Sequence, residues 1–188
     1  KPLGTDKVTG LVNYYGSLVI LKKTSLWKMT FVYDQVAAAF LPKLELLNRN
    51  YGCVGFRAYA WVENDIWFFT GNELRAVGFK DQQTGVLGVD ASVISNDIKE
   101  TLKLINSANA EKIVLFYNER KVYLCIPLTT TNDTVFVSHL LYKQAWCKIK
   151  GRKKSYVRSI DSRDGVVYFA SSNEAKLYRW NATWRDIA

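Results

Sequence analysis

Short apolar runs of strand length alternate with polar turns along this 188-residue chain. Four of these runs are rich in β-branched and aromatic residues, and each is followed, after a polar break, by a second apolar stretch. A short run that is apolar at nearly every position is typical of a strand covered on both faces, whereas the second stretches alternate more clearly. The pattern predicts four β-hairpins, near residues 16–29, 64–77, 120–137 and 164–180.

The first runs begin at Leu18, Ile66, Val122 and Val166, so the pattern recurs about every 50 residues. Repeats of this length, with strands in each copy, are typical of β-propeller blades. We therefore expect an all-β fold, a β-propeller or a propeller fragment of about four repeated hairpin or blade units. It would form a single domain over residues 1–188, and we expect that domain to be part of a longer chain.

One segment departs from the strand pattern. In residues 95–106, Ile98, Leu102 and Ile105 recur at helical spacing, and Asp97 with Glu100 resembles a capping box. This predicts one short amphipathic helix inserted between the repeats. Residues 35–40 could also be helical, although the segment is short and Pro42 follows it closely.

Composition places the chain among packed globular proteins, since 48% of its residues are hydrophobic and 14% are aromatic. The formal net charge is +9. Such a surplus favours acidic partners such as nucleic acid or an acidic protein surface, but it also simply keeps a protein soluble. No apolar run approaches the ~18 residues that a membrane-spanning helix needs, so we expect no membrane span.

A basic segment follows the third hairpin, and its charges are a candidate binding site for DNA phosphates or an acidic partner. The alternative is a solvated loop between repeats that contributes only to solubility. The candidate residues are Lys148, Lys150, Arg152, Lys153, Lys154 and Arg158.

Catalytic and metal-binding patterns are weak. The single histidine, His139, has no nucleophile motif beside it, and the three cysteines Cys53, Cys125 and Cys147 lack the spacing of a metal site. A buried thiol is the expected role of Cys125, which lies in an apolar run. We therefore predict no catalytic residues, no metal site and no cofactor, and expect that the protein is not an enzyme.

The segment "DGVVYFASSNEAKLYRW", which begins at Asp164, first suggests a metal loop or a sialidase-type repeat motif. Arg163 stands where a calcium loop that starts at Asp161 needs its second ligand, and Gly165 does not have the spacing of the sialidase motif. We interpret Asp164-Gly165 as the turn before a buried strand. Two carboxylate pairs, Glu63 with Asp65 and Asp161 with Asp164, also fall in predicted turns.

Six tryptophans could line a carbohydrate-binding surface, but four of them lie in or next to the predicted strands. Large aromatic rings at such positions more often fill the space between packed sheets. We therefore expect core positions for most of them, and an exposed position is most plausible for Trp184. The six are Trp27, Trp61, Trp67, Trp146, Trp180 and Trp184.

Over residues 11–181 the order and spacing of four motifs resemble the propeller-forming structural proteins of tailed-bacteriophage virions, namely connector, DNA-stabilisation and tail-tube or nozzle proteins. Each motif alone is only a fold signal. The motifs are Gly16-Ser17-Leu18, Gly52-Cys53-Val54, Asn64-Asp65-Ile66-Trp67-Phe68 and Tyr142-Lys143-Gln144-Ala145-Trp146.

The resemblance implies a non-enzymatic virion protein of the portal–tail channel that helps to retain or conduct DNA. It would be assembled in the host cytoplasm as a homo-oligomeric ring, contact portal or other tail proteins, and touch the DNA backbone without sequence specificity. Family propellers usually have more than four blades, which is a further reason to expect a fragment. The alternative is a cellular β-propeller domain that binds proteins or glycans; an enzyme acting on glycosides is a third hypothesis.

Overall fold

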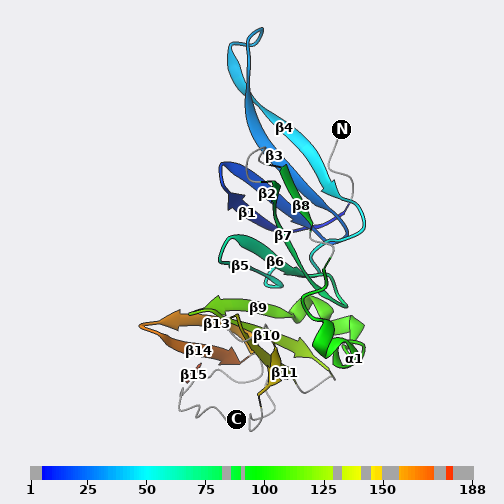
Figure 1. Ribbon diagram of the computed structural model, residues 1–188, viewed down its shortest axis with the longest axis vertical. Coiled ribbons are helices and arrows are strands. Elements are labelled where there is room, and N and C mark those ends of the chain that lie inside the picture. The colour runs from blue at the N-terminus through cyan, green and yellow to red at the C-terminus, as the bar shows by residue number, and fades with distance from the viewer. Residues whose placement is uncertain are drawn as a thin grey trace.

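The computed structural model describes residues 6–81, 86–89, 92–128, 133–140, 145–149, 157–171 and 177–179. These residues form mainly antiparallel strands in four sheets; the first three lie one above another along the long axis of the molecule, and the fourth lies beside the third (Figure 1). The predicted all-β class is therefore confirmed. In each sheet the strands pair in chain order, so every sheet is a meander.

The first three sheets have four strands each and the fourth has three. Strands 2 and 3 of each sheet correspond to one of the predicted hairpins. The bounds of the strands are: first sheet, β1 Val8–Tyr14, β2 Ser17–Lys22, β3 Leu26–Asp34 and β4 Ala39–Asn48; second sheet, β5 Tyr59–Val62, β6 Asp65–Phe69, β7 Leu74–Asp81 and β8 Val86–Val89; third sheet, β9 Val114–Asn118, β10 Lys121–Pro127, β11 Asp133–His139 and β12 Trp146–Lys148; fourth sheet, β13 Val157–Arg163, β14 Val166–Ser171 and β15 Leu177–Arg179.

A two-residue turn joins the first two strands of every sheet. The four turns are Tyr15-Gly16, Glu63-Asn64, Glu119-Arg120 and Asp164-Gly165. In all four the first residue has a positive φ, between 46° and 52°, a conformation whose twist matches that of the flanking strands. The interpretation of Asp164-Gly165 as a turn is thus confirmed, and the same local device recurs in each sheet.

Two apolar cores lie between the sheets. The larger core joins residues of the first three sheets, and the smaller one lies between the third and fourth. Strand β10 contributes to both, because Val122, Leu124 and Ile126 belong to the larger core while Tyr123 and Cys125 belong to the smaller. The alternation of side chains along a strand explains why an uninterrupted apolar sequence is needed where both faces are covered.

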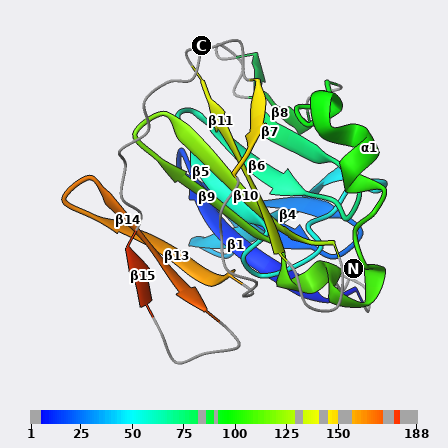
Figure 2. The ribbon, with the colours of Figure 1, turned by 90° about the horizontal axis from the view of Figure 1, so that it is seen from below.

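The first strands of consecutive sheets approach one another, since β5 contacts β9 and β9 contacts β13. Seen along the long axis, the first three sheets overlap, whereas the fourth, β13 to β15, lies to one side (Figure 2). Strands β4 and β8, the last of the first two sheets, are also in contact.

The inserted helical segment is shorter than predicted. A 3₁₀ turn, η1 (Asn96–Ile98), leads into the one-turn helix α1 (Lys99–Leu102), and a second 3₁₀ segment, η2 (Ser107–Lys112), follows. Ile98 and Leu102 are buried as expected. The predicted capping box is wrong, because neither N-cap position makes a side-chain cap hydrogen bond and Glu100 instead pairs with Lys103 at 2.7 Å.

The hairpin β3–β4 extends beyond its sheet (Figure 1). Strand β2 pairs with β3 only as far as Met29, so residues 30–43, which we call the arm, form a two-stranded ribbon. At its tip, Asp34 Oδ1 accepts hydrogen bonds from the backbone N–H groups of Val36 and Ala37, at 2.8 and 3.0 Å. The possible helix over residues 35–40 is therefore wrong, because these residues form a turn and the start of β4.

Candidate functional site

The predicted basic site falls mostly outside the described residues. Lys148, the last residue of β12, is exposed, and Arg158 lies in β13 at an irregularity of its pairing with β14. Ile149 and Val157, which are described, are buried in the core between the third and fourth sheets. Lys150, Arg152, Lys153 and Lys154 lie outside the described residues, so their role in binding stays a prediction.

An aromatic cluster joins the first two sheets, with members in β1, β5 and β7 and in the turn after β1. Its members are Tyr14, Tyr15, Trp61 and Phe79, whose ring centroids lie 4.8 to 6.0 Å apart in five pairs. Tyr14 and Phe79 are the inner part of the cluster, whereas Tyr15 is 58% exposed and Trp61 is 40% exposed. We call Tyr15 and Trp61 the aromatic patch.

Hydrogen bonds fix the orientation of these rings. The Tyr14 hydroxyl donates to the Asn64 carbonyl, the Tyr15 hydroxyl donates to Asn64 Oδ1 at 3.3 Å, and Trp61 Nε1 donates to the Glu63 carbonyl at 2.7 Å. Burial, followed by the nearby charge of Asp65, raises the pKa of Tyr14 to about 12. The hydroxyl of Tyr14 is therefore a neutral donor rather than a base or nucleophile.

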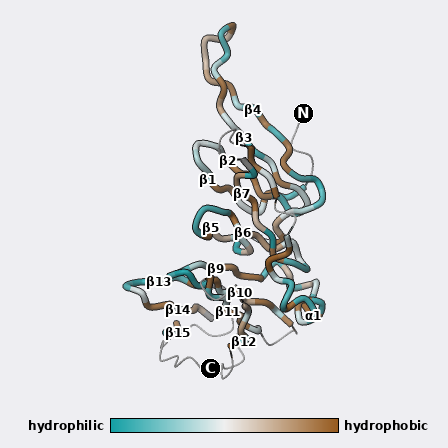
Figure 3. Tube along the Cα trace, viewed as in Figure 1, coloured by the Kyte–Doolittle hydropathy of each residue, from teal (hydrophilic) through white to brown (hydrophobic). Residues whose placement is uncertain are grey.

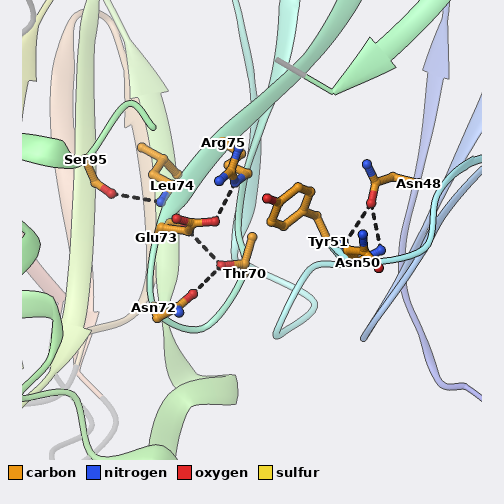
Figure 4. Close-up of polar contacts among 9 residues, drawn as sticks. All are labelled: Asn48, Asn50, Tyr51, Thr70, Asn72, Glu73, Leu74, Arg75 and Ser95. Carbon is orange, nitrogen blue, oxygen red and sulfur yellow. Dashed lines mark hydrogen bonds and ion pairs between the residues drawn. The ribbon is translucent and has the colours of Figure 1, made fainter. Parts of the chain in front are cut away.

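A polar network links the connection between the first two sheets to β7 (Figure 4). The Arg75 guanidinium, in a residue only 7% exposed, donates to Glu73 Oε1 and stacks over the Tyr51 ring, 3.9 Å from its centroid. Ser95 Oγ accepts from the backbone N–H of Leu74 at 2.9 Å. Asn48 Oδ1 accepts from the N–H groups of Asn50 and Tyr51 at 2.7 and 3.0 Å, shaping the loop that carries the ring.

The chemistry of this network is structural. In such an arrangement the carboxylate pairs with the charge of the guanidinium, and the aromatic ring stacks on its planar face. The network therefore joins Tyr51, from the connection after the first sheet, to Arg75 in the second.

Other candidate groups take ordinary positions. Glu63 and Asp164 lie in two-residue turns as predicted, but the turn positions predicted for Asp65 and Asp161 are wrong, because Asp65 begins β6 and Asp161 lies in β13. His139 ends β11 opposite Lys121. Within the described ranges, no three His, Cys, Asp or Glu side chains form a metal-binding group, and no helix is long and apolar enough to cross a membrane.

The cysteines differ in environment. Cys53 and Cys125 are buried and Cys147 is exposed, so the buried thiol predicted for Cys125 is confirmed. Burial raises the pKa of Cys53 to about 11, and its thiol donates to the Gly55 carbonyl at 3.2 Å. The Cys53 thiol is therefore a weak nucleophile, because the thiolate is the reactive form.

The tryptophans divide between core and surface. Trp67 is buried, and Trp27 and Trp146 are half-buried. Trp61 departs from the predicted core position, because it lies in the first strand of the second sheet, beside the exposed turn at Glu63. Trp180 and Trp184 lie outside the described residues.

The arm is the exposed feature that the sequence reasoning missed. Its sequence, "TFVYDQVAAAFLPK", is strongly hydrophobic, and the hydrophobic colours continue along the hairpin away from the stacked sheets (Figure 3). The available signal was the number of aromatic and aliphatic residues on both sides of Asp34. No family model matches the chain, and no curated protein matches it.

Proposed function

We propose that this chain is a structural assembly protein whose four sheets are consecutive propeller-type blades. The observation that carries this proposal is the fourfold recurrence of one meander with a two-residue turn between its first two strands. Contacts between the first strands of consecutive sheets are what blades around a common axis would make. Such a scaffold presents loops and edges to partners.

The finer proposal is a virion protein of a tailed bacteriophage, in the portal–tail channel. It rests on the sequence resemblance. The resembling residues have architectural positions here: Gly16 is in a turn, Cys53 is in the core, and Asn64 is in the turn before β6. Gly52 lies so close to the first sheet that an added Cβ would clash with the Lys22 carbonyl oxygen.

In this role the basic segment faces DNA or a neighbouring subunit. The chain's surplus of positive charge would hold the polyanion loosely, since phosphate contacts made by Lys and Arg are not sequence-specific. A structural protein of a DNA channel needs contact of this kind.

Two tests separate the proposal from its alternatives. The gene should lie beside portal and terminase genes, and the purified chain should assemble into rings that bind portal protein and hydrolyse no glycoside. A gene without those neighbours, combined with specific retention on a glycan array, would instead support the glycan-binding hypothesis. Glycoside hydrolysis that disappears when one carboxylate is removed would support the enzyme.

The DNA interaction has its own test. Replacement of Lys150, Arg152, Lys153 and Lys154 by alanine should reduce the slope of log affinity against log salt concentration by about 0.9 for each phosphate that is no longer neutralised. Lys103, an exposed lysine in the helical segment, provides the control as Lys103→Ala. An unchanged slope in the fourfold variant would remove the DNA role.

A further inference from the structure

One face of the hairpin β3–β4 is apolar along its whole length. Residues directly opposite each other in an antiparallel pair point to the same face, and alternate pairs share that face. The pairs on this face are Trp27 with Leu46, Met29 with Leu44, Phe31 with Pro42, and Tyr33 with Phe40.

The opposite face has a different character. It carries Lys28 opposite Glu45, Thr30 opposite Lys43, Val32 opposite Leu41 and Asp34 opposite Ala39. The hairpin is therefore amphipathic at its base, where Lys28, Lys43 and Glu45 lie on the second face. In the outer part the second face also carries the exposed apolar pair Val32 and Leu41, but the aromatic side chains are on the first face.

The outer part of the apolar face lies in water. Phe31, Tyr33 and Phe40 are between 53% and 67% exposed, and the rings of Tyr33 and Phe40 contact each other with centroids 5.3 Å apart. Since an aromatic side chain presents ~150–250 Å², these three leave roughly 300–400 Å² uncovered. That is close to half of the ~800 Å² that each partner buries in a standard protein interface.

Lipid does not fit this ribbon. From Thr30 to Lys43 both edges of the ribbon lie outside the sheet, and backbone groups that find no partner are strongly disfavoured in hydrocarbon. DNA does not fit the apolar face either, because that face carries no cation. A protein surface is the remaining class of partner.

The aromatic face offers more contact area than the edges of the ribbon. Pro42 lies in the outer strand β4 and has no N–H to donate, so it disfavours the addition of another strand along the β4 edge. We therefore expect the arm to bind a partner by packing its aromatic side chains against an apolar surface.

The same chain exposes a second apolar surface, the aromatic patch of Tyr15 and Trp61. Arm and patch are separate: the arm projects beyond the first sheet (Figure 1), whereas Tyr15 is in the turn between β1 and β2 and Trp61 is in β5. A chain that carries two different surfaces able to bind each other associates head to tail, and this kind of contact forms a closed ring when the rotation between copies closes and an open filament when it does not.

We propose that the apolar face of the arm docks on the aromatic patch of a second copy of this chain. This rests on the homo-oligomeric ring of the proposed function and names the contact that builds it. Aromatic side chains on both sides make the contact of the kind that dominates protein interfaces. The arm of each copy then reaches the next one around the assembly.

The test compares three variants of the chain by mass photometry and sedimentation across a range of concentrations. Phe31→Ser/Tyr33→Ser/Phe40→Ser removes the arm face, and Tyr15→Ser/Trp61→Ser removes the patch. Phe56→Ser/Leu104→Ser is the control, because both side chains are 65% exposed and lie outside the two surfaces. The arm variant and the patch variant should each raise the dissociation constant of the assembly roughly tenfold or more relative to the wild type, as is typical when interface hot spots are lost. The control should assemble as the wild type does.

A second measurement tests the contact without the serine substitutions, in case a variant fails to fold. A photo-crosslinking phenylalanine analogue at position 40, in an equal mixture of isotopically light and heavy chains, should give mixed cross-links to peptides that contain Tyr15 or Trp61. A monomeric wild type, arm variants that assemble normally, or arm-dependent flotation on vesicles of phosphatidylcholine and phosphatidylglycerol would each overturn the proposal. Normal assembly of the arm variant into rings that bind portal protein would leave the proposed function standing.

Discussion

The hairpin β6–β7 and the arm contain similar residues in different surroundings. Strand β6, "DIWFF", belongs to the second sheet, and its four apolar side chains lie in the core that joins the first three sheets. The arm, with Phe31, Tyr33 and Phe40, extends from the first sheet past the last residue paired with β2. Hydrophobic sequence is common to both, and only the presence of a covering sheet differs.

This difference separates two uses of an apolar strand. In β6 it stabilises the stack, because each side chain is removed from water on folding of the single chain. In the arm the same kind of side chain stays in contact with water when the single chain folds, so it contributes little to stability until a partner molecule covers it. Substitutions in β6 should therefore lower the free energy of unfolding of the single chain more than substitutions in the arm do. Substitutions in the arm should weaken assembly more than substitutions in β6 do.

The largest effect is expected for Phe68→Ala in β6. Phe68 is fully buried, so the substitution removes its transfer free energy and leaves a cavity, lowering the free energy of unfolding by about 3–5 kcal/mol. Urea denaturation followed by tryptophan fluorescence measures it. A loss below about 1 kcal/mol would mean that the second sheet is not packed between its neighbours.

A smaller effect is expected for Glu73→Gln. It removes the carboxylate from a buried guanidinium, and a charge-assisted hydrogen bond of this kind contributes about 1.5–3 kcal/mol. Glu100→Gln is the matched control, because it breaks the exposed ion pair with Lys103 and should leave the unfolding curve unchanged. Equal effects of both substitutions would contradict the structural role assigned to Arg75.

Alkaline pH should sharpen the contrast between the inner and outer rings of the aromatic cluster. The folded-state pKa of Tyr14 is raised from 10.0 to about 12, so the unfolded chain loses this proton first. The stabilisation is complete below pH 10 and is lost as pH rises through 12, by an amount on the order of 1–2 kcal/mol.

Tyr14→Phe removes this titrating group. The difference in unfolding free energy between the wild type and Tyr14→Phe should therefore shrink from pH 9 to pH 12, measured in guanidinium at each pH. Tyr15→Phe, at an exposed ring, serves as the control for changes elsewhere in the cluster. A constant difference across this range would contradict the raised pKa.

The strand pattern could be predicted because covering both faces of a strand demands apolar residues at every position. Val122 to Ile126 satisfies that demand and is confirmed as a strand between two cores. Asp164-Gly165 was also predictable, since glycine permits the second position of the turn.

The exposed surfaces could not be predicted, because exposure depends on which sheet lies opposite. The sequence around Asp34 resembles that of a buried hairpin, and Trp61 resembles the other strand tryptophans. The predicted capping box of Asp97 and Glu100 failed for a local reason, since Asp97 lies inside the 3₁₀ turn η1 rather than at an N-cap, and the side chain of Glu100 accepts from Lys103. Whether the basic segment binds DNA stays a prediction, because its central residues lie outside the described ranges.

The smallest effect on folding is expected for Phe40→Ala, in the arm. Phe40 is 67% exposed and its main contact is the cross-strand ring of Tyr33, so the single chain should lose less than about 1 kcal/mol on unfolding. The measurement is made by urea denaturation at concentrations where the wild type is dissociated. At higher concentrations the wild type should gain stability with concentration and the variant should gain less, because association stabilises the folded form by mass action. A cost comparable with that of Phe68→Ala in the dissociated chain would show that the arm packs on its own molecule, and would remove the distinction between the two hairpins.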